Sequence, residues 1–370
     1  FVDMISTQNR NHAIDILKGI SIIAVILYHL GISEFGYLGV DIFFVISGYL
    51  VALGLAKNFS QDRFSFWSYL NKRLSRLWPG LVLISAISLT IGWQFMMPLH
   101  YKLNCESVIG TLTFTNNFVQ YITGGDYWTT ANEFKPLMHT WYIGILMQFY
   151  IIVPIIFIVA KRYTIQWLKT VFYTLSALSF LSLILYLSPL MSESQDFYML
   201  STRFFELGGG GLLALAMIDN ANNSKSLRAY FFCILLLLSI ILIFGTAIGA
   251  MKLRLTIITA LSILMVGCSN YFNIPSKLQK ILLPISYLGI ASYSLYLSHQ
   301  VFFAFYRYIV NNIFTPATYL LVLLASLVIG ILLYIVFEKP LSLYISKRAS
   351  NMYRVNGICL SLIHISEPTR

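Results

Sequence analysis

The stretch YLGVDIFFVISGYLVALGLA, residues 37–56, decides the fold class of this chain. It is twenty residues long and carries one charged side chain, Asp41. About twenty consecutive apolar residues are what a helix needs to cross the hydrocarbon core of a bilayer. Similar runs recur along the 370 residues, of which 58% are hydrophobic and 11% charged, whereas soluble domains carry roughly 25% charged residues. The sequence therefore predicts an all-α, polytopic membrane protein, because only self-bonded backbones such as helices are stable in lipid.

Apolar runs between polar or Pro/Gly breaks predict about ten transmembrane helices. The run that contains residues 208–211, four consecutive glycines, is the shortest, and small residues in such a run are typical of close helix approach or a kink. The predicted spans are residues 13–30, 37–56, 77–97, 139–160, 168–188, 204–218, 229–247, 252–268, 286–306 and 317–337.

The distribution of positive charge predicts the orientation. With the N-terminus inside, 17 of the 25 Lys and Arg residues fall in predicted cytoplasmic segments and 6 in outer segments. Because Lys and Arg collect on the cytoplasmic side, both termini are predicted to lie inside. The same rule accounts for the net charge of +11. Since no basic stripe is interleaved with soluble structure, we predict no nucleic-acid partner.

The predicted organisation is one membrane domain, residues 13–348, between an N-terminal cytoplasmic segment, 1–12, and a tail, 349–370. The end of the tail, SLIHISEPTR (361–370), fits no span and is expected to be non-native sequence. The longest predicted outer segment, about residues 98–138, is rich in Asn, Thr and aromatic residues. Those rings suit stacking on sugars, and an interfacial aromatic belt explains them equally well. The four cysteines lack ligand spacing, so we predict no metal.

Ionisable side chains inside membrane spans are costly and are candidates for function. The first span, HAIDILKGISIIAVILYH (residues 12–29), holds Asp15, Lys18 and His29. Lys18 and His29 are eleven residues apart, which places them on one helix face, about 16 Å apart along the axis. A neutral imidazole can act as a general base. The alternatives are a lysine that reaches the headgroups and a histidine that packs between helices.

Six segments, in order, resemble membrane acyltransferase family 3, the O-antigen acetylase type. The resemblance covers about residues 12–348 and implies ten core helices in a bacterial inner membrane. It also implies transfer of an acyl group, commonly acetyl from acetyl-CoA, to a sugar hydroxyl of a surface or secreted glycan. The segments are GYLGVDIFFVISGYL (36–50), FWSYLNKRLSRLWP (66–79), PLMHTWYIGILMQFY (136–150), STRFFELGGGGLLAL (201–215), SYSLYLSH (292–299) and FEKP (337–340).

The resemblance implies that cationic side chains bind the acyl donor and that a histidine acts on the acceptor. Lys72, Arg73 and Arg76 are expected to meet the phosphates of CoA, because guanidinium forks and ammonium groups suit phosphate. Simple positive-inside topology is the alternative. Lys18 is expected to stabilise the donor inside the bundle. His29 is expected to activate the acceptor hydroxyl or to relay the acyl group.

Five further residues receive predictions of this kind. His139 and Trp141, at the outer start of the fourth span, are expected to help form the acceptor site or to anchor the helix at the interface. Asp41 is expected to orient a cation or the backbone near the start of its helix. Arg203 and Glu206 are three residues apart on one turn, a spacing at which they can also simply pair with each other.

Two features depart from the family pattern. Lys18 stands where the family has an arginine, so charge is kept and the bidentate fork is lost. Leu146 and Met147 stand where the fourth helix usually has two glutamates. The role of those carboxylates is therefore dispensable in this chain, is taken by another acid such as Glu206 or Asp41, or is lost.

For His299 and Glu338, packing or a helix-end role is favoured over chemistry. The resemblance implies acyl-CoA as a co-substrate, and we expect no bound cofactor. A membrane transporter or exporter, and an inactive acyltransferase paralogue, are the competing hypotheses. No second copy of the first two spans' motifs is visible, and this counts against a transporter built from internal repeats.

Overall fold

The computed structural model describes residues 11–123, 130–218, 251–269, 276–310 and 315–344, together with residues 235, 238 and 239. Within these ranges all regular elements are helical. The elements are α1 (His12–His29), η2 (Gly36–Leu38), α2 (Gly39–Ser60), α3 (Phe66–Phe95), α4 (Pro98–Leu112), α5 (Asn116–Thr123), η3 (Thr130–Phe134), η4 (Met138–Thr140), α6 (Trp141–Tyr163), α7 (Trp167–Leu187), α8 (Glu193–Tyr198), α9 (Leu200–Ile218), α11 (Met251–Ser269), α12 (Ser276–Ile290), α13 (Ser292–Val310), α14 (Pro316–Leu333) and η5 (Tyr334–Glu338).

The predicted class, an all-α polytopic membrane protein, is confirmed. Among the described residues, seven helical segments are long and apolar enough to cross a membrane: His12–His29, Gly36–Ser60, Phe66–Phe95, Met138–Tyr163, Trp167–Leu187, Met251–Ser269 and Pro316–Tyr344. The predicted span at 229–247 and the predicted tail at 349–370 lie outside the described residues, apart from the three isolated positions. The outer segment predicted at 98–138 is largely helical and forms α4, α5 and two short 3₁₀ helices.

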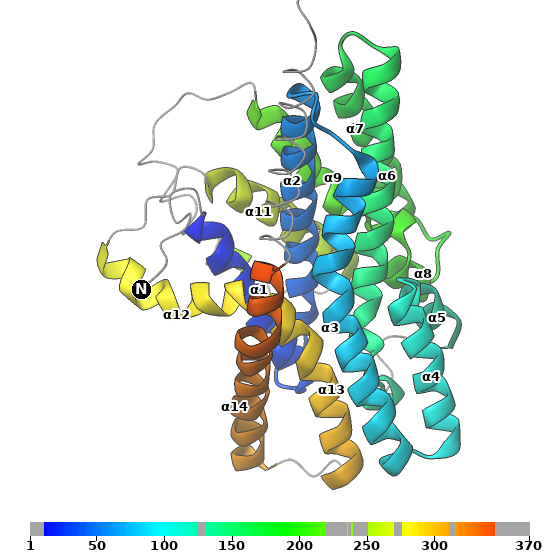
Figure 1. Cartoon of the computed structure of the whole chain (residues 1–370), viewed down its shortest axis with the longest axis vertical. Coiled ribbons are helices and arrows are strands. Elements are labelled where there is room, and N and C mark those ends of the chain that lie inside the picture. Colours follow the sequence, from blue (N-terminus) through cyan, green and yellow to red (C-terminus); the bar gives the residue numbers. More distant parts are fainter. Residues whose placement is uncertain are drawn as a thin grey trace, which may run out of the picture.

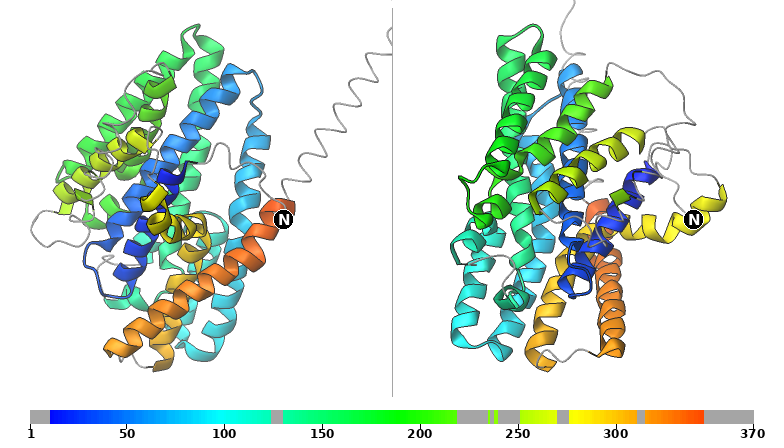
Figure 2. Two further views of the ribbon diagram at one scale, coloured as in Figure 1. Left: turned by 90° about the vertical axis from the view of Figure 1, so that its left-hand side faces the viewer. Right: turned by 180° about the vertical axis from the view of Figure 1, so that it is seen from behind.

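Two of the spans predicted within the described residues, 204–218 and 286–306, are not among these seven segments. The apolar run 286–306 is divided at Ala291, which separates α12 from α13. Figures 1 and 2 show α12 running across the bundle, whereas α13 runs along it. The cause is the crossing of α12 with α1, where Gly19 and Gly289 let the backbones touch. A Cβ added to Gly289 would lie 1.8 Å from the carbonyl oxygen of Asp15, and one added to Gly19 would lie 2.0 Å from that of Ile285.

Helix α2 lies at the centre of the bundle and packs against α1, α6, α9 and α11 (Figure 1). Its crossing with α9 also depends on glycine. A Cβ added to Gly48 would lie 1.8 Å from the carbonyl oxygen of Leu207, and one added to Gly210 would lie 2.0 Å from that of Val45. The glycine run of α9 therefore serves close helix approach, as its composition predicts.

Capping and exposure fit a bundle with lipid around it. Asn11 begins α1, because its side-chain oxygen accepts from the backbone N–H groups of Ala13, at 3.1 Å, and Ile14, at 3.3 Å. The outermost helices expose large apolar side chains, including Phe180 on α7 and Leu321 on α14. In water such a surface would be unfavourable, and in a bilayer it meets acyl chains.

Gly48→Ala should destabilise the protein, because the added methyl must push apart the α2 and α9 backbones. Overpacking of this kind costs about 1–3 kcal/mol. Gly54→Ala is the matched control, since Gly54 lies on the same helix with nothing within 4 Å of an added Cβ. We expect a lower melting temperature in detergent for Gly48→Ala and an unchanged or higher one for Gly54→Ala. Equal melting temperatures for the two variants would contradict the close crossing.

Candidate functional site

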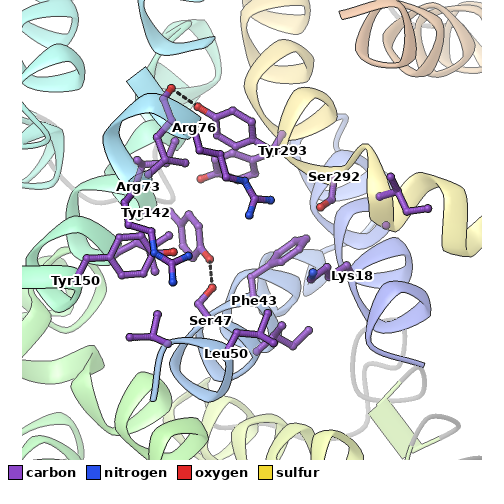
Figure 3. A pocket seen from close by; sticks show the side chains of 18 of the residues that line it. Lys18, Phe43, Ser47, Leu50, Arg73, Arg76, Tyr142, Tyr150, Ser292 and Tyr293 are labelled. Atoms are coloured by element: carbon purple, nitrogen blue, oxygen red, sulfur yellow. Dashed lines mark hydrogen bonds between the residues drawn. The ribbon is translucent and has the colours of Figure 1, made fainter. Parts of the chain in front are cut away.

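A pocket lined by cations lies between α1, α2, α3, α6 and the junction of α12 with α13 (Figure 3). Its internal volume is about 180 Å³. Lys18 enters it from α1, and Arg73 and Arg76 enter it from α3. Of the lining residues only Asp15 is acidic, and its carboxylate lies 3.9 Å from the Lys18 ammonium. We call this the cationic pocket, and its excess of positive charge suits an anionic ligand.

Arg73 is held in the cationic pocket by aromatic rings. Its guanidinium carbon lies 5.2 Å from the ring centre of Tyr69 and 5.0 Å from that of Tyr150, distances at which a cation is attracted to a ring face. Leu146, one helical turn before Tyr150, lines the same pocket. An apolar side chain therefore stands in the pocket wall where the resembling family has a glutamate.

Tyr142 and Tyr296 form a wall at one side of the cationic pocket, with ring centres 5.5 Å apart. The hydroxyl of Tyr142 lies 3.3 Å from that of Ser47 (Figure 3), and the hydroxyl of Tyr296 donates to the backbone carbonyl of His139. The ring of Tyr296 also contacts the rings of His139 and His299, at 5.1 Å and 5.8 Å between centres. This tyrosine wall thus has the cationic pocket on one side and imidazoles on the other.

Behind the tyrosine wall, three imidazoles from three parts of the chain meet. The ring centre of His299, on α13, lies 5.1 Å from that of His29 at the end of α1 and 5.3 Å from that of His139 in η4. His139 and His299 are fully buried, and His29 is nearly so. We call these residues the histidine cluster. Buried imidazoles of this kind can take part in acid–base chemistry.

Two side chains of α13 fasten the chain around the histidine cluster. Arg307 donates to the backbone carbonyl of His29 at 2.7 Å and to that of Glu133 at 3.3 Å. Gln300 donates to the carbonyl of Lys135 at 3.1 Å. Burial lowers the pKa of Lys135, whose side chain belongs to this segment. The segment 133–135 and the end of α1 are therefore held to one helix.

A buried ion triad lies at the crossing of α2 and α9. One guanidinium nitrogen of Arg203 lies 2.8 Å from a carboxylate oxygen of Asp41 and 3.0 Å from one of Glu206. All three side chains are at most 2% exposed. The guanidinium also faces the rings of Phe197, at 4.9 Å, and Trp141, at 5.9 Å. Neither acid lines the cationic pocket.

The ten residues predicted from the sequence separate into three places and one surface position. Those in the cationic pocket are Lys18, Arg73 and Arg76. Those in the histidine cluster are His29 and His139. Those in or against the ion triad are Asp41, Arg203, Glu206 and Trp141. Lys72 is exposed and does not line the pocket. The sequence favours a packing role for His299. Its place at the end of the motif SYSLYLSH is the one feature of the sequence that indicates a functional role.

Comparison with known proteins gives matches of two kinds. A sequence model described as an acyltransferase domain matches residues 11–335. Staphylococcus aureus O-acetyltransferase OatA is 30% identical over 148 residues, which are 39% of this chain and 24% of that protein. A putative O-acetyltransferase of S. aureus strain COL is 30% identical over 213 residues, 54% of this chain and 34% of that one. An uncharacterised Haemophilus influenzae protein is 29% identical over 211 residues, 55% of this chain and 84% of that one.

The alignments thus span about a quarter and a third of the two Staphylococcus proteins. No solved structure matches the chain.

Arg203→Met should be strongly destabilising, because it leaves two carboxylates buried with no cation between them. Removing one partner from a buried ion pair costs roughly 3–5 kcal/mol. Lys102→Met is the control, since the Lys102–Glu106 pair, at 3.9 Å, is largely exposed and contributes little. We expect loss of the monodisperse peak in size-exclusion chromatography, or a large fall in melting temperature, for Arg203→Met alone. A parent-like Arg203→Met would show that the ion triad does not hold α2 to α9.

Proposed function

The chain belongs to the acyltransferase family whose model spans residues 11–335, and from this premise we propose that it transfers an acyl group from acyl-CoA to a hydroxyl of a cell-surface or secreted glycan. Acetyl is the proposed acyl group, since the named relatives are O-acetyltransferases. The observation that carries the proposal is the pairing of a cationic pocket with a buried histidine cluster across a wall of two tyrosines.

The cationic pocket is proposed to hold the anionic part of the donor. Arginine forks bind phosphate oxygens in pairs, and Arg73 is already oriented by Tyr69 and Tyr150. The pocket volume of about 180 Å³ is below the roughly 300–1,000 Å³ of sites that enclose a whole ligand. It therefore accommodates one section of acyl-CoA, and the remainder extends outside it.

The histidine cluster is proposed to act on the acceptor. His29 takes the proton of the acceptor hydroxyl as that oxygen attacks the thioester carbonyl carbon. The new C–O bond forms, the C–S bond breaks, and the leaving thiolate takes up a proton to become CoA thiol. Lys18, which lines the cationic pocket, is proposed to stabilise the bound donor there.

The predicted orientation places the two ends of α1 toward opposite sides of the membrane. With the N-terminus inside, Lys18 and the cationic pocket lie toward the cytoplasm, where acyl-CoA is found. His29, at the C-terminal end of α1, then lies toward the outer face and the glycan. We propose on this ground a bacterial inner-membrane location with both termini cytoplasmic.

The proposed function is tested in proteoliposomes supplied with acetyl-CoA and an extracted surface polysaccharide. The parent protein should release CoA thiol and form ester-linked acetyl groups, the first measured with a thiol reagent and the second by mass spectrometry. His29→Gln should lose at least a hundredfold in kcat, within the roughly 10²–10⁴-fold that general acid–base catalysis contributes. An inactive paralogue would release no thiol with any acyl-CoA or glycan, and a His29→Gln variant as active as the parent would remove His29 from the mechanism.

Arg73→Gln and Arg76→Gln should each raise KM for acetyl-CoA about tenfold, because a hydrogen bond to a charged group contributes roughly 1.5–3 kcal/mol. Lys72→Gln should have a smaller effect, since Lys72 does not line the pocket. Lys57→Gln is the matched control for loss of charge on the same predicted side. KM measured against acetyl-CoA in proteoliposomes decides. An equal rise in all four variants would mean that overall charge, not the pocket, attracts the donor.

A further inference from the structure

His299 lies at the meeting point of the histidine cluster. Its ring contacts those of His29, at 5.1 Å, His139, at 5.3 Å, and Tyr296, at 5.8 Å between centres. His29 and His139 are both in ring contact with His299, which links them. Its side chain is fully buried.

The backbone around His299 selects one tautomer. Its Nδ1 lies 3.1 Å from the backbone carbonyl oxygen of Leu295, one turn earlier on α13. A carbonyl oxygen only accepts hydrogen bonds, so Nδ1 of the neutral ring carries the proton. The other nitrogen, Nε2, is then left with a free lone pair and is a base.

That base has no partner at rest. Nε2 of His299 is buried and makes no hydrogen bond with any described residue. Leaving a buried acceptor unsatisfied costs roughly 1–3 kcal/mol, so such an atom calls for an explanation. The only other ionisable side chains in ring contact with it are His29, His139 and Tyr296 within the described structure, and the Tyr296 hydroxyl is engaged with the carbonyl of His139. The Nε2 lone pair of His299 is therefore suited to accept a proton from a neighbouring imidazole that has become protonated.

We propose that His299 acts through His29, and that its Nε2 receives the proton that His29 removes from the acceptor hydroxyl; this rests on the proposed function. His29 binds the hydroxyl proton at one ring nitrogen and passes the proton of its other ring nitrogen to His299. The O–H bond of the acceptor and the C–S bond of the donor break, and the ester C–O bond forms. When the thiolate leaves, the same two imidazoles return the proton, and CoA departs as a thiol. No further reactant is needed.

In this role His299 is a positioning residue, and the resting contact without a hydrogen bond between the rings is no obstacle. Hydrogen bonds in catalytic sites are often long in the absence of substrate and shorten when it binds. Arg307 holds the carbonyl of His29 at 2.7 Å and belongs to the same helix as His299, so the two imidazoles are fixed to one support.

His299→Asn is the decisive variant. The asparagine amide can still donate to the carbonyl of Leu295, but nothing remains at the position of Nε2. We expect kcat to fall at least tenfold, KM for acetyl-CoA to stay within twofold, and the melting temperature to stay close to that of the parent. Imidazole added to His299→Asn should recover part of kcat, because it can occupy the vacated space. It should recover none in His299→Phe, which fills that space.

Ser298→Ala is the matched control, since Ser298 is the neighbouring buried residue on α13 and bonds only to its own helix, at 2.9 Å to the carbonyl of Ser294. Its kcat should equal that of the parent. A parent-like kcat for His299→Asn would overturn the proposal, as would a loss of kcat that imidazole does not restore while the fold is intact. If His299→Asn does not fold, His299→Gln, which keeps more of the volume, is subjected to the same kcat and KM measurements. A parent protein that releases no CoA thiol would instead reject the proposed function itself.

Discussion

One guanidinium shared by two carboxylates holds the centre of this molecule together. Arg203 ties Asp41 on α2 to Glu206 on its own helix, at the crossing where Gly48 and Gly210 bring the two backbones into contact. Charges buried this deeply are tolerated only when paired, so the two helices have one favourable register. The cationic pocket and the histidine cluster both depend on that register. The pocket is lined by α2, and Trp141, which faces the guanidinium, begins the helix that follows His139.

The histidine cluster is assembled from segments that are distant in sequence. His29 ends α1, His139 lies in a single 3₁₀ turn, and His299 lies within α13. Arg307, on the same helix as His299, donates to the carbonyl of His29 and to that of Glu133 in η3. A change of position in any one helix would therefore be felt by all three imidazoles. This linkage fixes the imidazoles relative to one another, although His139 lies on a short connecting segment.

Much of this arrangement follows from the sequence, and the remainder depends on packing. Apolar runs predict the spans because lipid demands helices, and the charged motif predicts Arg73 and Arg76 near a donor. The same motif cannot separate them from Lys72, because neighbouring residues on a helix face different directions and only the packing of α3 decides which face meets the pocket. His299 was expected to pack, since its helix alone does not reveal that α1 and η4 present imidazoles to it. Hydropathy does not predict the break at Ala291, because it measures the apolar character of a run and not the direction of the helix axis.

The tyrosine wall has a meaning for the cell beyond the reaction. A protein with a charged cavity on one side and proton-binding groups on the other is close to being a channel. A continuous file of water molecules between them would let protons cross the bilayer and would dissipate the electrochemical gradient. Tyr142 and Tyr296 insert aromatic rings at that point, and their hydroxyls are already engaged with Ser47 and with the carbonyl of His139. The two rings occupy space that such a file of water would need, so the wall between the two halves of the site also works against proton leakage.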